Sequence, residues 1–158
     1  MRDEFSTLNI ESALGIKLER LRGWMKAGFI RPTHKSRGQG RPATFTRADV
    51  YRIALFEQLI SAGFKREMAA DCVNNTVKEK DVKQLRHITF TYEATSNKII
   101  FGKFAIRSAM LNLERGVFED GKTNRPLHKP INWNHIHVVN FDLIKTMVDN
   151  SLAVLPER

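Results

Sequence analysis

Apolar residues in the first half of the chain recur at the three- and four-residue spacing that is typical of amphipathic helices. Residues 5–14 predict a short helix, for which Ser6 or Asn9 could each serve as N-cap. Gly15 then allows a tight turn into a second predicted helix, at about residues 17–27. The inward stripe of that helix is formed by Leu14, Leu18, Leu21 and Met25. On the same helical wheel, the outward residues are Lys17, Arg20 and Trp24, and the flanking residues are Glu19, Arg22, Gly23 and Lys26.

A polar segment follows the second helix, and two more helices are predicted beyond it. Residues 33–43 contain no large apolar side chain, and the short apolar segments on either side of them predict a two-stranded wing. Thr46 is the expected N-cap of a helix with Asp49 at position N3, and this helix ends at Gly63. Its buried side is formed by Val50, Ile53, Phe56, Leu59 and Ile60. Another helix is predicted over about 65–77, with Met68, Cys72 and Val73 facing inward.

From about residue 79 the pattern changes from helical spacing to alternation. Residues 87–93 alternate strictly between polar and apolar, and with 98–104 they predict a β-hairpin. The other elements expected here are a short helix at 105–115, an irregular segment at 118–130, a strand at 135–139 and a last helix at 141–152. The predicted fold class is therefore α+β, with a winged helix-turn-helix domain (residues 1–78) and a small α+β dimerisation or effector domain (residues 79–158).

Positive charge is concentrated in the predicted second helix and wing. The formal net charge of the chain is +9, and ten of its 26 Lys and Arg lie between residues 17 and 52, against two acidic residues. Charge focused on one segment indicates a polyanionic partner, and we expect this partner to be double-stranded DNA.

The composition also limits the other classes of protein. The longest apolar segments are too short to cross a membrane, and the polar N-terminus lacks the apolar segment of a signal peptide. The single cysteine, Cys72, excludes an internal disulfide and a Cys-based zinc finger, and it is expected to be packed. We therefore expect a cytoplasmic protein.

A series of short motifs in the first half resembles the MerR-type winged helix-turn-helix. The matching positions over residues 5–77 are Gly15-Ile16, Leu21-Arg22, Trp24, Gly28-Phe29-Ile30 with Pro32, Phe45-Thr46, Asp49-Val50 and Gly63-Phe64. Three positions depart from the family pattern: Lys17 stands where a Ser or Thr cap is usual, Gly23 replaces an aromatic residue that touches the DNA backbone, and Glu11 replaces a small residue. Residues 79–158 also lack the long heptad helix through which typical members dimerise.

A helix in the major groove reads base edges, which Arg and Lys side chains contact at guanine. We expect Lys17 and Arg20 to make such contacts and Lys26 to bind a phosphate. From the resemblance, Arg22 is expected to have either a phosphate-binding or a structural role. Trp24 either packs on a sugar–phosphate strand or seals the edge of the core beneath the wing. These interpretations place helix 17–27 in the major groove.

The wing, residues 33–44, adds a second group of candidate contacts. Gly40-Arg41-Pro42 is similar to segments that insert an arginine into a narrow minor groove. Lys35, Arg37 and Arg47 are expected to meet phosphates, which position the protein without reading sequence.

No pattern of catalytic residues stands out, so we expect neither an enzyme nor a bound cofactor. His135 and His137 alternate on a predicted strand with His128 nearby, but no Cys, Asp or Glu in that stretch completes a metal site, and we predict none.

The sequence as a whole predicts a sequence-specific DNA-binding transcriptional regulator, bacterial or from a phage, acting as a homodimer. Two alternatives remain open: an architectural or accessory DNA-binding factor, such as an excisionase-like or phage packaging protein, and a protein-interaction module with a basic face. A small-molecule sensor in residues 79–158 is a further alternative, in which the aromatic strand at 88–92 lines a pocket. Packing of this strand against the last helix explains its aromatic residues equally well.

Overall fold

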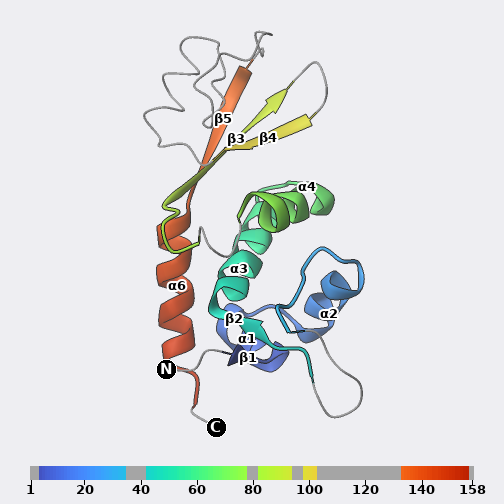
Figure 1. Ribbon diagram of the computed structural model, residues 1–158, viewed down its shortest axis with the longest axis vertical. Coiled ribbons are helices and arrows are strands. Elements are labelled where there is room, and N and C mark those ends of the chain that lie inside the picture. Colours follow the sequence, from blue (N-terminus) through green and yellow to red (C-terminus); the bar gives the residue numbers. More distant parts are fainter. Residues whose placement is uncertain (1–3, 35–41, 78–81, 94–97, 103–132, 157–158) are drawn as a thin grey trace. The chain divides into compact units, whose positions relative to one another are not determined.

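The computed structural model describes residues 4–34, 42–77, 82–93, 98–102 and 133–156 (Figure 1). These residues form an α+β structure, as the sequence predicts. The chain divides into two compact units, of which the first comprises residues 1–84 and 143–158 and the second comprises residues 85–142.

The first unit contains the helices and one small sheet. Its elements are β1 (Glu4–Phe5), α1 (Thr7–Leu14), α2 (Leu18–Lys26), β2 (Phe45–Thr46), α3 (Arg47–Ser61), α4 (Arg66–Asp71), the π-helical turn η1 (Cys72–Thr76) and most of α6 (Phe141–Ala153). β1 pairs antiparallel with β2. The strand β1 is not apparent in the sequence pattern, because a two-residue strand is too short to show alternation.

Helix α1 begins with a reciprocal capping box. The Ser6 hydroxyl accepts a hydrogen bond from the Asn9 backbone, and the Asn9 side chain accepts one from the Ser6 backbone. Both predicted cap candidates therefore take part, with Ser6 as the N-cap. Gly15 ends the helix in the left-handed region at φ 66°, and the chain can turn directly into α2.

Helix α3 is the centre of the first unit's core. Most of its residues are buried, including Val50, Leu55 and Phe56, each of which is fully buried. An amphipathic helix buries only one side, whereas a helix surrounded by partners buries most of its circumference. The predicted N-cap Thr46 and the capping box with Asp49 are confirmed.

The segment after α3 is less regular than predicted. In place of one helix over 65–77, α4 covers only six residues and continues as η1. The Val77 N–H donates to the carbonyl of Cys72, five residues earlier, which is the wider π-helical spacing. The turn keeps Cys72 and Val73 buried, as expected.

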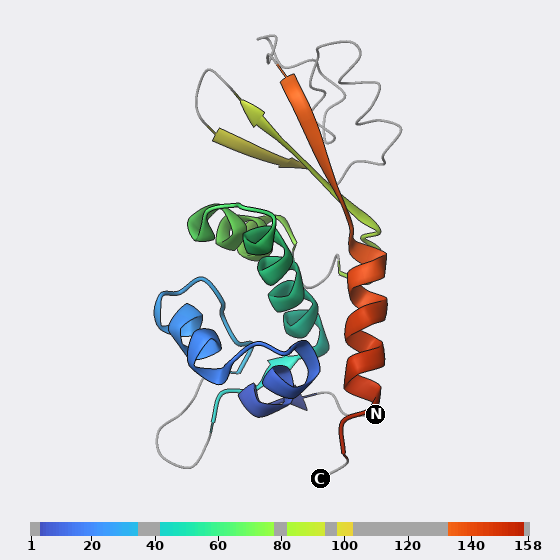
Figure 2. The same ribbon diagram turned by 180° about the vertical axis from the view of Figure 1, so that it is seen from behind.

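The structure divides the chain differently from the predicted boundary near residue 78. From Leu143 onward, α6 lies within the first unit, alongside α3 (Figures 1 and 2). Its buried side is formed by Ile144, Val148 and Leu152. The spacing of these residues predicts a helix with one apolar face, but periodicity alone does not say which part of the chain covers that face.

The second unit contains a three-stranded antiparallel sheet in the order β4–β3–β5 (Figure 2). Its strands are β3 (His87–Glu93), β4 (Lys98–Gly102) and β5 (Trp133–Asn140). The predicted hairpin is confirmed, with Phe90 of β3 opposite Phe101 of β4. On its other edge β3 pairs with β5, where the register shifts between Thr91 and Glu93. The predicted helix at 105–115 and irregular segment at 118–130 lie outside the described residues.

Candidate nucleic-acid interface

Helix α2 has an unusual cap that explains two departures from the expected pattern. Lys17 occupies the N-cap position and makes no side-chain capping hydrogen bond. Instead, the carboxylate of Glu11 in α1 accepts a hydrogen bond from the Leu18 N–H at 2.9 Å. An acidic group at a helix N-terminus satisfies an otherwise free donor and interacts favourably with the helix dipole. Glu11 therefore takes over the role that a Ser or Thr at position 17 would have.

Helix α2 is rotated relative to the predicted helical wheel. The outward position of Trp24 on the predicted wheel is wrong, and the alternative that it packs at the core is the one that agrees with the structure. Its side chain is only 3% exposed and packs edge-to-face on Phe56, with 5.0 Å between ring centroids. Leu21 beside it is fully buried, whereas Leu18 and Met25 are half-buried. The indole carries far more apolar area than the other candidates, so its burial decides the rotation.

Because of this rotation, the residues expected on the flanks of α2 form its exposed face. Four neighbouring positions on that face are exposed: Glu19, Arg22, Gly23 and Lys26. Lys17 at the start of the helix is exposed as well. Within the described ranges, no acidic side chain forms an ion pair with Lys17, Arg22 or Lys26, so these cations remain open to a polyanion.

The Arg20 side chain makes contacts within the first unit and is not free. Its guanidinium lies 3.1 Å from a carboxylate oxygen of Glu57 in α3 and 4.7 Å from the centre of the Trp24 ring. The side chain still exposes 45% of its surface. Arg20 is thus positioned at the side of the exposed α2 face. Its Nη1 group would have to leave Glu57 before both Nη groups could donate hydrogen bonds to a base.

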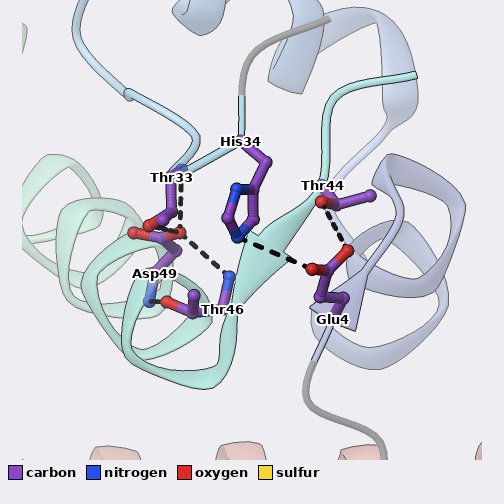
Figure 3. Close-up of polar contacts among 6 residues, drawn as sticks. All are labelled: Glu4, Thr33, His34, Thr44, Thr46 and Asp49. Atoms are coloured by element: carbon purple, nitrogen blue, oxygen red, sulfur yellow. Dashed lines mark hydrogen bonds and ion pairs between the residues drawn. The ribbon is translucent and has the colours of Figure 1, made fainter. Parts of the chain in front are cut away.

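The base of the predicted wing is closed by a short β-bridge and three side-chain links (Figure 3). His34 and Thr44 exchange backbone hydrogen bonds of 3.2 and 3.0 Å across it. On one side of the bridge, Glu4 accepts a hydrogen bond from the Thr44 hydroxyl at 2.9 Å and lies 3.5 Å from the His34 ring nitrogen. On the other side, Asp49 accepts hydrogen bonds from the Thr33 backbone and hydroxyl at 3.1 and 2.6 Å.

These links fix where the loop between residues 34 and 44 leaves the core. Lys35, Arg37 and Arg41, the candidate contacts within the wing, lie outside the described residues. The two flanking residues of the loop pair in antiparallel fashion, which is the arrangement that a two-stranded wing requires.

Arg47 was predicted to meet a phosphate, but its guanidinium is already paired. It donates a 2.5 Å hydrogen bond to Asp149 in α6 and lies 5.8 Å from the centre of the Phe5 ring. Tyr51 donates to the same Asp149 oxygen at 2.7 Å, and burial together with this hydrogen bond raises the pKa of Tyr51 to about 12. Arg47 therefore ties α3 to α6 in this structure. The sequence could not reveal it, because the partner lies 102 residues away.

Sequence reasoning did not select Arg31 as a contact, although it is exposed between α2 and the base of the loop. The sequence feature that points to Arg31 as a contact is its position within the basic segment, residues 17–52.

The remaining predicted features are the buried cysteine and the histidines of the second half of the chain. Cys72 is fully buried, as expected, and burial raises the pKa of its thiol to about 12. His135 and His137 lie on β5, and His128 lies outside the described residues. Among the residues that the structure describes, no group of three His, Cys, Asp or Glu side chains is placed to hold a metal ion. No helix within the residues that the structure describes is long and apolar enough to span a membrane.

A capped α1, a glycine turn and a second helix with an exposed cationic face together define a helix-turn-helix domain of the DNA-binding class. Residues 9–75 match the family described as MerR HTH family regulatory protein, and this segment is a MerR-type helix-turn-helix domain. The match covers less than half of the chain and ends at the last residues of η1. No curated protein matches the chain. At the level of the family, the domain is that of a DNA-binding transcription regulator.

Proposed function

We propose that this protein is a sequence-specific transcriptional regulator that places α2 in the major groove of DNA. The observation that carries this proposal is the exposed face of α2, on which the cations have no acidic partner in the described part of the chain. The N-terminal residues of a recognition helix reach the base edges, and residues further along meet the backbone. We therefore assign base contacts to Lys17 and Glu19, and phosphate contacts to Arg22 and Lys26.

Glu19 is a new candidate that follows from the rotation of α2. A carboxylate accepts a hydrogen bond from the amino group of cytosine, whereas it would be repelled by a phosphate. Its exposure in the first turn of α2 therefore favours base reading over simple backbone binding. Arg20 is assigned a supporting role beside the groove, because Glu57 and Trp24 hold its guanidinium.

The wing completes the proposed interface. We propose that residues 33–44 lie on the flanking backbone or minor groove, with Arg41 entering the groove and Lys35 and Arg37 binding phosphates. Support comes from the closed base of the loop, because a fixed exit point lowers the entropy that the loop loses on binding. Trp24 and Arg47 are left out of the interface, since the first is buried and the second is paired with Asp149.

The proposed regulator acts as a homodimer in the cytoplasm of a bacterium or of a phage-infected cell. Large apolar side chains of α6 and the residues that follow it support the dimer: Leu143 and Met147 are 56% and 54% exposed, and Val154 is 81% exposed. Leu143 and Met147 are four residues apart and lie on one side of α6, and Val154 follows directly after the helix. A second copy could cover these side chains.

Selection of bound sites from random double-stranded DNA, using the full chain, tests this function. We expect a defined site with an inverted repeat, and a binding constant that falls by about 0.9 log units per log unit of salt for each phosphate neutralised. Arg22→Ala and Lys26→Ala should weaken binding to all DNA, whereas Glu19→Gln should change the preferred base at one position. The matched control is Lys83→Ala, an exposed cation outside α2 and the loop.

Other results would redirect the assignment. Recovery of tandem direct repeats, with bending of the DNA, would favour an architectural or accessory factor over a two-fold symmetric regulator. Recovery of no site, with equal weak binding to every duplex, would contradict sequence-specific regulation.

A further inference from the structure

A cavity of about 150 Å³ lies within the first unit, lined by the end of α1, by α3 and by α6. The apolar part of its wall is formed by five side chains: Leu14, Ile16, Ala54, Ile144 and Val148. Gln58 and Met147 also line it and are exposed, so the cavity is open to solvent on their side. An apolar cavity of about 150 Å³ is large enough to bind a single six-membered ring such as benzene.

Glu57 of α3 adds a carboxylate to the lining of this cavity. One of its oxygens, Oε1, accepts a hydrogen bond from Arg20 at 3.1 Å. The other oxygen, Oε2, is buried and accepts no hydrogen bond from any residue that the structure describes. A buried polar atom without a partner lowers stability, and such atoms are rare in native proteins. Glu57 therefore lacks one hydrogen-bond donor beside the cavity.

The surroundings of Glu57 indicate which kind of donor is missing. Arg20 already supplies a positive charge to the carboxylate, so a second cation is not required. The apolar wall also disfavours a charged occupant, because burying a charge costs more than burying a neutral polar group. The last torsion of a glutamate side chain is broad, so Oε2 can turn toward an occupant with little strain. The cavity therefore suits a neutral ring that carries one O–H or N–H group.

We propose that this cavity is a binding site for a small neutral single-ring molecule that donates a hydrogen bond to Glu57. The inference goes beyond the proposed function, because it places a ligand site inside the helix-turn-helix unit. An occupant would share the Glu57 carboxylate with Arg20 of α2, and so it would lie next to the proposed DNA-binding helix. Binding is measured on the free protein, so failure of this inference leaves the proposed function standing.

Phenol and toluene are the probes, because the two rings have the same number of non-hydrogen atoms and only phenol carries a donor. Each is titrated into the full chain, and dissociation constants are obtained from the backbone signals in two-dimensional ¹H–¹⁵N NMR spectra. Phenol should bind with a dissociation constant of about 1 mM, as expected for so small a ligand. It should bind about tenfold more tightly than toluene, because its hydroxyl bonds to a carboxylate.

Glu57→Met tests the role of the carboxylate. Methionine is an unbranched side chain of similar length without a strong acceptor, so the phenol hydroxyl loses its partner. The order of affinities should then reverse, with toluene binding about tenfold more tightly than phenol. A reversal of order cannot arise from a general loosening of the fold, which would weaken both probes alike.

Ser151→Leu tests the location of the site. Ser151 lines the cavity from α6, and a leucine there should fill the cavity and weaken both probes at least about tenfold. The matched control is Ser61→Ala, because Ser61 is exposed in the last turn of α3 and does not line the cavity. It should leave both affinities unchanged. Melting curves of all three variants establish that they are folded under the conditions of the titration.

The same titrations can overturn the inference. Tighter binding of toluene than of phenol to the wild type would show that Glu57 does not recognise a donor. Binding of neither probe, or binding of phenol that survives Ser151→Leu, would show that the cavity is not the site. Phenol binding that appears only after dilution of the protein to the monomer would identify a second copy of the chain, rather than a small molecule, as the occupant.

Discussion

Asp49 offers the sharpest test of how the first unit supports its loop. Its side chain is only 2% exposed, and its carboxylate collects hydrogen bonds from several directions. Thr33 donates from its backbone and its hydroxyl, and the Thr46 backbone donates at 2.9 Å (Figure 3). Arg52, 19% exposed, pairs with the other carboxylate oxygen. One carboxylate thus joins the start of α3 to the base of the loop.

Asp49→Ala should lower the free energy of unfolding by about 3–5 kcal/mol. Thr46 still caps α3 in this variant, but the Thr46 backbone N–H and the two Thr33 donors lose their acceptor. Each donor left without a partner costs about 1 kcal/mol or more. The unpaired Arg52 raises the cost further, because removing one member of a buried ion pair leaves the other charge uncompensated. A domain is typically stable by only about 5–15 kcal/mol, so this loss is easily measured.

Equilibrium unfolding in urea measures the effect, with the midpoint expected to fall and the slope unchanged. Thr33→Val is the matched comparison, because it removes one donor and leaves the cap intact, and it should cost about 1 kcal/mol. A loss below 1 kcal/mol for Asp49→Ala would refute the view that this carboxylate organises the base of the loop.

The other predictions concern α2 and the contact between α3 and α6. Glu11→Ala should lower the unfolding free energy by about 1 kcal/mol, measured in urea, because the α2 N-terminus loses its cap; the exposed Glu19→Ala, as control, should cost less. Trp24→Ala should cost about 3–5 kcal/mol in the same assay, and a small loss would contradict its burial against Phe56. Because the pKa of Tyr51 is raised from 10.0 to about 12, its contribution to stability is complete below pH 10 and is lost as the pH rises to about 12. Denaturant midpoints between pH 9 and 12 should therefore fall more for the wild type than for Tyr51→Phe, and parallel curves would contradict this.

The departures at Glu11 and Lys17 illustrate how two local anomalies can have one cause. Read separately, each weakens the resemblance to the expected helix-turn-helix pattern. In the structure the Glu11 carboxylate binds the Leu18 N–H, so the absent cap at Lys17 is replaced from the preceding helix. The link spans seven residues across a turn, a distance at which sequence motifs for capping no longer apply.

The sequence by itself determined the local elements and the character of the basic segment. The caps at Ser6 and Thr46, the hairpin of β3 and β4, and the MerR-type domain were all predictable, because each depends on neighbouring residues. Capping, turn formation and strand alternation operate over a few residues, and a single sequence records them directly.

Only the tertiary structure decided which side of α2 faces outward and where α6 belongs. Both depend on which apolar side chains are buried in the same core. Trp24 is buried against Phe56, and Ile144 and Val148 of α6 are buried on the side of α6 that lies near α3. The resulting ion pairs, such as Arg47 with Asp149, join residues that are far apart in the chain. Their formation depends on how the whole unit packs, which the spacing of residues along the chain does not specify.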